Sequence, residues 1–196
     1  MSKAMKKGRL IVISAPSGAG KTSLIAALLK THAQQLRLSV STTTRAPRPG
    51  EEHGKDYFFC SQEVFKNKID QGAFLEWALV HGNYYGTSRD WIENQLNQGA
   101  FILLEIDWQG AQQIRAQFAK DQVVSIFIRP PTVEVLRQRL IDRGKDTAEV
   151  IEERVKAATE ELTHAHEFDY VIMNQEFAVA LRGLSELITA IVSTPA

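Results

Sequence analysis

The strongest indication of the fold is the stretch Leu10-Ile11-Val12-Ile13-Ser14-Ala15-Pro16-Ser17-Gly18-Ala19-Gly20-Lys21-Thr22. Its first four residues form an apolar, largely β-branched run, which is typical of a buried strand in a parallel sheet. Downstream, Leu24, Leu28 and Leu29 stand at helical spacing within residues 22–30. A strand, a glycine-rich turn and a helix in that order predict an α/β fold.

The turn matches the pattern G-x-x-x-x-G-K-[ST], except that Ala15 stands where the first glycine is usual. Gly18 and Gly20 would let backbone N–H groups curl around phosphate oxygens, and the following helix would point its positive end at the same anion. Lys21 would supply a cation to the β- and γ-phosphates, and Thr22 a hydroxyl to Mg²⁺. An alanine at position 15 predicts a turn that needs no glycine-only backbone there. The predicted ATP-binding loop is Ala15, Pro16, Ser17, Gly18, Ala19, Gly20, Lys21 and Thr22.

The same alternation of apolar runs and amphipathic segments continues along the chain. Further buried strands are predicted at residues 101–104, 123–128 and 170–173. Helices are predicted at residues 88–97, 107–118, 133–142 and 176–192. This pattern predicts a parallel sheet flanked by helices, as in the P-loop NTPases.

Two segments interrupt the alternation. Residues 38–90 are rich in aromatic residues, Thr, Arg and Gly, and they predict an inserted α+β lobe with a helix at 62–71. Residues 130–166 predict a helical lid, with a break at 143–145 between its two helices. We therefore expect a single domain over residues 1–196, with its core formed by 8–37, 91–129 and 167–192.

The second helix of the lid has its own start signal and apolar stripe. Asp146 is expected to cap this helix, with Glu149 in the reciprocal position of a capping box. The residues of the expected stripe are Ile151, Val155, Ala158, Leu162 and Ala165.

Composition limits the class of protein. Apolar residues make up 44% of the 196 residues, enough for a core, and the 23 basic and 23 acidic residues cancel. A neutral chain argues against a nucleic-acid binder held by overall charge. The one cysteine, Cys60, fits a reduced cytoplasmic protein. No apolar run approaches the roughly 20 residues of a membrane span, and residues 1–7 are expected to be a solvated end.

Two short matches suggest a GTPase. Residues 107–110 fit D-x-x-G and residues 67–70 fit N-K-x-D. A GTPase requires the second motif after the first, at the end of a buried strand. Here the order is reversed, and residues 67–70 lie in a predicted polar helix whose buried face would be Phe65 and Ile69. We therefore disfavour a GTPase.

Several segments of the lobe resemble one known family. They are SVSTTTRAPRPGE (39–51), GKDYFF (54–59), FLEW (74–77) and GNYYGT (82–87). These closely resemble the GMP-binding lobe of the guanylate kinases, which are P-loop nucleoside monophosphate kinases. The resemblance extends to LEIDWQG (104–110) and to the arginine-bearing region after Pro130-Pro131, and it spans about residues 8–190. It implies an enzyme of purine nucleotide metabolism that moves the γ-phosphoryl of ATP onto GMP or dGMP with the help of Mg²⁺.

The resemblance assigns the reading of guanine to Glu76. A carboxylate can accept hydrogen bonds from both N1–H and the 2-amine of guanine, whereas adenine would leave it unpaired. By resemblance, Thr87 and Ser41 lie near the O6 edge of the base.

The resemblance also implies groups for the GMP phosphate and the metal. Four residues are expected to bind this phosphate: Arg45, Arg48, Tyr57 and Tyr85. Glu105 and Asp107 are expected near the substrates. Because they alternate after the 101–104 run, we expect them to face opposite sides of a strand. The sequence leaves open which one meets Mg²⁺, although Asp107 and Thr22 are the metal candidates.

Arginines of the lid are the remaining candidates. Arg139 and Arg143 are four residues apart and should share a helix face, and Arg154 lies on the next helix. They resemble lid arginines that close over ATP, where cations would stabilise the charge that develops during transfer. Arg137 is a weaker candidate, and Asn174 is expected to help hold adenine. The expected catalytic residues are Lys21, Arg45, Arg139, Arg143 and Arg154.

Two other functions fit part of the pattern. A non-catalytic guanylate-kinase-like binding module typically has a degraded phosphate loop, whereas Gly20, Lys21 and Thr22 are intact here. A P-loop kinase for another small acceptor would not need Glu76. The expected partners are therefore ATP and GMP or dGMP, with no nucleic acid or membrane. A monomer and a homodimer both remain open.

Overall fold

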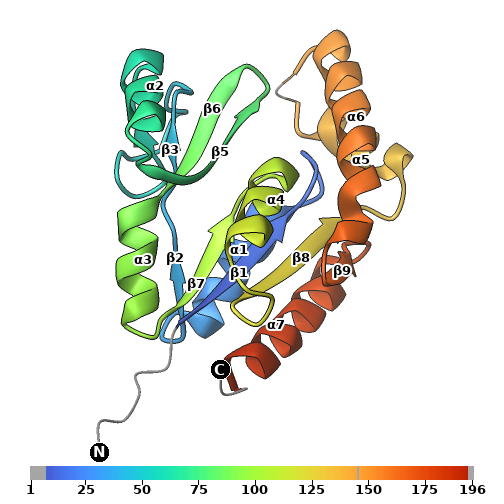
Figure 1. Ribbon diagram of the computed structural model, residues 1–196. Helices are drawn as coiled ribbons and strands as arrows, with labels where there is room; N and C mark the ends of the chain where they lie inside the picture. Colours follow the sequence, from blue (N-terminus) through green and yellow to red (C-terminus); the bar gives the residue numbers. More distant parts are fainter. Residues whose placement is uncertain (1–7, 145, 194–196) are drawn as a thin grey trace, which may run out of the picture. The chain divides into compact units, whose positions relative to one another are not determined.

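The computed structural model describes residues 8–144 and 146–193 (Figure 1). The expected solvated end at residues 1–7 and Lys145 in the expected break lie outside the described residues. The chain divides into two compact units. The described part of the first unit is 8–11 and 36–123, and that of the second is 12–35, 124–144 and 146–193.

The parallel sheet predicted from the sequence is confirmed. Strand β1 (Arg9–Ser14) runs through both units, and the five-stranded sheet has the order β2-β7-β1-β8-β9. Strand β2 (Leu36–Leu38) pairs in parallel with β7 (Phe101–Glu105), and β8 (Val123–Arg129) pairs in parallel with β9 (Tyr170–Met173). Residues 10–13 are fully buried, as the apolar run predicted. The prediction that residues 170–173 form a buried strand is wrong: β9 is at the edge of the sheet, and three of its four residues are exposed.

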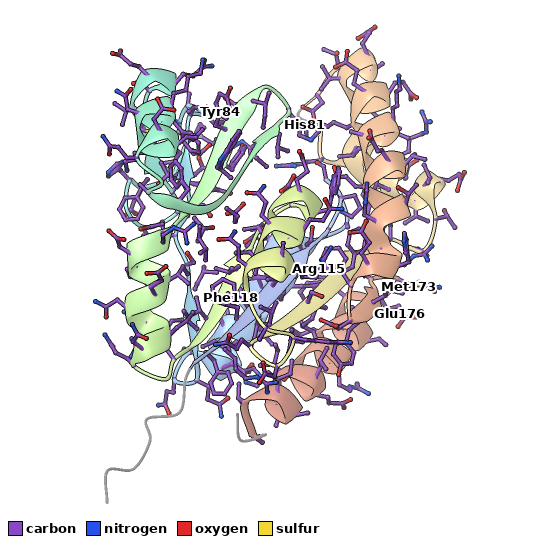
Figure 2. The ribbon with its side chains drawn as sticks, viewed as in Figure 1. His81, Tyr84, Arg115, Phe118, Met173 and Glu176 are labelled. Carbon is purple, nitrogen blue, oxygen red and sulfur yellow. The ribbon has the colours of Figure 1, made fainter. Side chains whose placement is uncertain are left out.

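The first unit also contains a second sheet within the segment predicted as an α+β lobe. Its strand order is β4 (Phe58–Phe59), β3 (Thr42–Thr43), β6 (Asn83–Ser88) and β5 (Phe74–Val80). The β5–β6 connection turns at His81 and Gly82, with φ of 47° and 76°, and Figure 2 shows His81 at its tip. Positive φ at both central residues is the geometry of a tight hairpin turn.

Helix α2 (Gln62–Asp70) covers part of this sheet through Phe65. The Phe65 side chain is fully buried, and its ring stacks on those of Phe74 and Tyr84 at centroid distances of 4.4 and 5.4 Å. The N-K-x-D match at 67–70 therefore lies inside a helix, as expected. The unit is completed by α3 (Arg89–Asn97) and α4 (Trp108–Gln117).

The second unit consists mainly of helices. Helix α1 (Lys21–His32) follows the glycine-rich loop and packs against α7 (Phe177–Ser193), where His32 Nε2 lies 2.8 Å from Ser185 Oγ. Helices α5 (Val133–Asp142) and α6 (Ala148–Thr163) lie side by side (Figure 1), followed by a 3-10 turn at His164–Glu167. Their contact is an apolar cluster of Leu136, Leu140, Ile151, Val155 and Ala158.

The predicted cap of α6 is wrong by one residue. Thr147, not Asp146, is the N-cap, and its hydroxyl accepts a hydrogen bond from the N–H of Val150 at 3.5 Å. Asp146 instead forms an ion pair with Arg154. Glu149 does not close a capping box: hydrogen bonds from its own N–H and from the Thr147 hydroxyl lower its pKa. Asp and Thr are both favourable N-cap residues, and here Asp146 is engaged in the ion pair while Thr147 caps the helix.

No helix in the described part of the chain combines the length and apolar character that crossing a membrane requires.

Candidate functional site

The predicted phosphate loop lies in the second unit, between β1 and α1. Gly18 and Gly20 have φ of 89° and 90°, in the left-handed region that favours glycine. Ala15 does not, since His81 is the only non-glycine residue with positive φ among the described residues. The sequence-based expectation for Ala15 is thus confirmed. Gly20 is the N-cap of α1, so Lys21 and Thr22 begin the helix.

Both glycines also allow other elements to approach the loop closely. A Cβ on Gly18 would lie 3.2 Å from Leu140 Cδ2 of α5. A Cβ on Gly20 would lie 2.5 Å from Asn174 Nδ2, which is closer than real Cβ atoms come to such neighbours. Gly20 therefore leaves room for Asn174 as well as supplying the conformation, whereas at Gly18 an added Cβ would make a tight contact that the Leu140 side chain would have to relieve.

Asn174 supports the loop from the end of β9. Its side chain is buried, and Nδ2 donates a hydrogen bond of 2.7 Å to the carbonyl of Ala19. Its Oδ1 atom is buried without a hydrogen-bond partner among the described residues. The sequence suggested Asn174 as an adenine contact and gave no sign of this bond, because the partners are 155 residues apart.

The lid arginines have different surroundings within the second unit. Arg139 Nη2 donates to the carbonyl of Asn174 at 2.7 Å, which joins two residues predicted separately. Arg154 pairs with Asp146 at 3.3 Å. Arg143 is exposed just after α5 ends, while Arg137, the weaker candidate, pairs with Glu152 on α6.

One polar atom of the Arg139 guanidinium takes no part in these contacts. Its Nη1 atom is buried and has no hydrogen-bond partner among the described residues. A guanidinium with a spare buried donor is suited to an additional anionic or carbonyl acceptor.

The predicted base-reading residues lie together in the first unit. Glu76 on β5 and Thr87 on β6 are paired in register, and both are buried. The Thr87 hydroxyl donates to Glu76 Oε1 at 2.5 Å. Glu76 is only 3% exposed, and burying a carboxylate costs free energy unless its oxygens are hydrogen-bonded. Glu76 is therefore not an ordinary solvated surface charge.

The predicted phosphate ligands are organised around a residue to which the sequence assigned no role. Glu51 Oε1 and Oε2 accept hydrogen bonds from Arg45 Nη2 at 2.7 and 2.9 Å, and Oε2 also accepts one from the N–H of Arg48 at 2.7 Å. Two anionic oxygens held by these groups resemble a bound phosphate in their chemistry. Glu51 stands three residues after Arg48 in the quoted motif, but the sequence analysis assigned this acid no role.

This pairing changes the titration of both partners. The hydrogen bond from Arg45 is the main cause that lowers the pKa of Glu51. Burial acts to lower the pKa of Arg45, but the hydrogen bond and the charge of Glu51 outweigh it and leave the pKa raised. The Arg45 guanidinium also lies 5.4 Å from the centre of the Tyr57 ring, and that ring is 6.0 Å from the ring of Tyr85.

A pocket in the first unit brings Ser41, Tyr57 and Glu105 together. Its lining is Leu38, Ser39, Val40, Ser41, Lys55, Asp56, Tyr57 and Glu105. Burial, and then the charge of Glu105, raise the pKa of Tyr57 to about 12, so its hydroxyl stays a proton donor at neutral pH. Three residues that the sequence placed at the acceptor nucleotide therefore share one cavity.

The expected alternation of Glu105 and Asp107 is wrong. Glu105 is the last residue of β7, but Asp107 lies beyond the strand as the N-cap of α4. Its Oδ1 accepts from the N–H of Gly110 at 2.9 Å, and its Oδ2 accepts from Gln109 Nε2 at 3.0 Å. Residues two apart in a strand face the same side, so the alternation argument was wrong in itself. In addition, β7 ends at Glu105, two residues before Asp107.

Comparison with known proteins finds similarity to one family. Residues 7–191 match the family model for guanylate kinase. A guanylate kinase of Idiomarina loihiensis is 52% identical over 184 residues, which cover 93% of this chain and 87% of that protein. A guanylate kinase of Cupriavidus pinatubonensis is 53% identical over 183 residues, covering 93% and 83%.

A solved structure is similar along nearly the whole chain. The crystal structure of guanylate kinase from Anaplasma phagocytophilum aligns with a TM-score of 0.79 and 35% identity, covering 96% of this chain and 88% of that one. The match to the family model and the two relatives, each about half identical over most of both chains, show the family. The chain belongs to the guanylate kinase family.

Proposed function

We propose that this chain transfers the γ-phosphoryl group of MgATP to GMP, and to dGMP, to give ADP and GDP. Membership of the guanylate kinase family supports the reaction. The observation that carries the choice of acceptor is the buried carboxylate of Glu76, fixed by the hydroxyl of Thr87. We also propose that the enzyme works in the cytoplasm, which the lone Cys60 favours.

The second unit supplies the donor half of the reaction. In this proposal the N–H groups of the loop 15–22 and the positive end of α1 hold the ATP phosphates, and Lys21 neutralises the β- and γ-oxygens. Positive charge near the negative charge that develops on the transferring group comes from Arg139, Arg143 and Arg154. The spare buried Nη1 of Arg139 supports such a role. A contact of Asn174 with adenine stays a prediction.

The first unit supplies the acceptor half. Glu76 accepts hydrogen bonds from N1–H and the 2-amine of guanine, and Ser41 and Thr87 lie at the same end of the base. The phosphate of GMP is bound by Arg45, Arg48, Tyr57 and Tyr85. This phosphate takes the place of the Glu51 carboxylate at the Arg45 guanidinium. The pocket that Ser41, Tyr57 and Glu105 share supports this grouping. We keep the division into core, lobe 38–90 and lid 130–166 as part of the proposal.

The residues present fit a magnesium ion held mainly by substrate. Mg²⁺ usually binds through one or two protein oxygens, phosphate oxygens and water. The described residues include no cluster of three or more His, Cys, Asp or Glu that could hold a metal. Thr22 lies at the start of α1 and Asp107 caps α4, and we propose the hydroxyl of the one and the carboxylate of the other, each taken by itself, as candidate oxygen ligands. When bound, the ion would neutralise charge on the phosphates.

The proposed chemistry needs no general base. The attacking atom is a phosphate oxygen that is already anionic at neutral pH, so orientation and charge neutralisation suffice. Tyr57 remains neutral at that pH because its pKa is about 12, and it acts as a hydrogen-bond donor. A buried, water-poor site would also limit the transfer of phosphate to water.

An acceptor panel tests the proposal. ADP formation is measured with purified protein and MgATP in the presence of GMP, dGMP, AMP or CMP. We expect GMP and dGMP to react at least about 100-fold faster than AMP, because adenine leaves the buried carboxylate unpaired. Equal rates with GMP and AMP would contradict the assignment of Glu76. A fully active Lys21→Ala variant would contradict that of the loop.

A further inference from the structure

Helix α4 occupies the outer edge of strand β5, the last strand of its sheet. An edge strand leaves backbone N–H and C=O groups without a neighbouring strand. Here the side chains of α4 take the place of a strand, and Figure 1 shows the two elements next to each other. Gln113 Oε1 accepts from the N–H of Trp77 at 3.1 Å, and Gln113 Nε2 donates to the carbonyl of Trp77 at 2.8 Å. Gln117 Nε2 donates to the carbonyl of Leu75 at 2.8 Å.

These three hydrogen bonds lie on either side of Glu76. Leu75 and Trp77 are its immediate neighbours, so α4 fixes the backbone both before and after it. The pairing of β5 with β6 is also irregular here: Phe74 pairs with Ser88, but Glu76 pairs with Thr87. Such an irregularity re-aims a side chain. The position of the Glu76 carboxylate thus depends on the bonds to α4 as well as on the sheet.

The first turn of α4 also sets the space for the carboxylate. A Cβ on Gly110 would overlap Glu76 Oε2 and would lie 3.0 Å from Glu76 Cδ. The third neighbouring atom is Asp107 Oδ1, at 3.4 Å. No backbone atom is among these nearest neighbours, so an alanine at position 110 would push aside the end of the Glu76 side chain rather than the strand or the helix.

We propose that Gln113 and Gly110 are positioning residues that set the Glu76 carboxylate and thereby determine selectivity for a base that carries a 2-amine. The inference rests on the proposed function, in which Glu76 reads guanine. Gln113 holds the strand from which the carboxylate projects, and Gly110 leaves the room into which it projects. Neither residue needs to touch the substrate.

The comparison of GMP with IMP isolates this effect. Hypoxanthine keeps N1–H and O6 but lacks the 2-amine, so it offers the carboxylate one donor instead of two. Two parallel hydrogen bonds require a carboxylate at the correct distance and tilt, because hydrogen bonds weaken steeply with angle. A displaced carboxylate loses the second bond while a single bond can still adapt. The GMP:IMP ratio of kcat/KM should therefore fall when the carboxylate is misplaced.

The experiment measures kcat/KM for GMP and for IMP, the KM for ATP and the melting temperature. The variants are Gln113→Met, Gly110→Ala and Glu76→Gln, with Gln122→Met, outside α4, as the control for the same substitution. Methionine keeps the length of glutamine but makes neither bond to Trp77. We expect Gln113→Met to lower kcat/KM for GMP by about 10-fold and the GMP:IMP ratio several-fold, with a larger loss for Gly110→Ala. The KM for ATP should stay within about twofold, and Gln122→Met should match the unaltered protein in every quantity.

A purely structural role would lower the melting temperature without changing the GMP:IMP ratio. If Gln113→Met and Gly110→Ala keep the ratio while Glu76→Gln loses it, the positioning role is wrong and Glu76 still reads the base. If Glu76→Gln also keeps the ratio, the assignment of Glu76 in the proposed function is wrong. The positioning role of Gln113 and Gly110 is then wrong as well. Should Gly110→Ala fail to fold, Gln113→Met together with Gln117→Met decides the question.

Discussion

The two units present their candidate binding groups in different ways. In the second unit, the phosphate loop is a continuous stretch, and its groups are mainly backbone N–H groups shaped by Gly18 and Gly20. In the first unit, the candidate groups are side chains from separate segments: Ser41, Arg45, Tyr57, Glu76, Thr87 and Glu105. A phosphate has the same shape in every nucleotide, so a local backbone loop can hold it. A base has an individual pattern of donors and acceptors, which needs side chains brought together by the fold.

The halves are alike in one respect, since each is braced by a side-chain amide. Asn174 holds the carbonyl of Ala19 in the donor half, and Gln113 holds the backbone of Trp77 in the acceptor half. Both amides act on the backbone next to a residue that we propose to contact substrate. If the halves work separately, a substitution in one half should not alter how the other half binds its substrate.

The largest effect is expected from Lys21→Ala in the donor half. Removal of a cation that stabilises the transferring phosphoryl group should lower kcat by roughly 10³-fold. The loss should be the same with GMP and with IMP, since Lys21 contributes nothing to reading the base. Steady-state rates with both acceptors check this. A loss confined to one acceptor would contradict the separation of the two halves.

A smaller effect is expected from Asn174→Ala. The Ala19 carbonyl would lose its donor, and a loop that is less well held should raise the KM for ATP by about 10-fold. The KM for GMP should not change. Asn174→Asp should be worse than Asn174→Ala, because it places a charged oxygen opposite the carbonyl oxygen. Equal KM values for ATP in all three proteins would show that the bond does not support the loop.

The buried Tyr57 of the acceptor half should make the unfolding free energy depend on pH. The pKa of Tyr57 is about 12 in the folded protein, above its ordinary value of 10, so the folded state keeps a proton that the unfolded state loses. The related stability is fully present below pH 10 and is lost as the pH rises towards 12. Between pH 9 and 11, the unaltered protein should lose about 1.4 kcal/mol more unfolding free energy than Tyr57→Phe. Urea unfolding at both pH values measures this, and identical losses would contradict the burial of Tyr57.

The smallest effect is expected at the cap of α6. Thr147→Ala should lower the unfolding free energy by about 1 kcal/mol, because the N–H of Val150 loses its acceptor. Thermal unfolding measures the change. Ala148→Gly, at the first position of the same helix, is a control for helix propensity alone. An unchanged stability in Thr147→Ala would argue for Asp146 as the working cap.

The sequence predicted most of the fold because its signals are local. The buried run at 10–13, the glycines of the loop and the helical spacing at 133–142 each depend on residues close together in the chain. The limits of the helices were correct to within one or two residues. The error at Asp146 arose because two neighbouring polar residues can both cap a helix. The error at Asp107 arose because residues two apart share a face of a strand, and because β7 ends at Glu105.

The candidate site was harder to predict from the sequence than the fold. The loop could be recognised from residue types alone, but the acceptor half was suggested only by resemblance to a family. Nothing in the local pattern shows that Glu51 binds Arg45, or that Gln113 binds Trp77, 36 residues away. Such contacts depend on how the strands and helices pack, which composition and periodicity do not specify.

Calorimetric titration of Glu76→Gln with GMP, and separately with a non-hydrolysable ATP analogue, tests the central claim most directly. The account predicts that GMP affinity falls by about 10- to 100-fold, because an amide cannot accept both guanine donors, while affinity for the ATP analogue is unchanged. Unchanged GMP affinity, or an equal loss for both nucleotides, would contradict it.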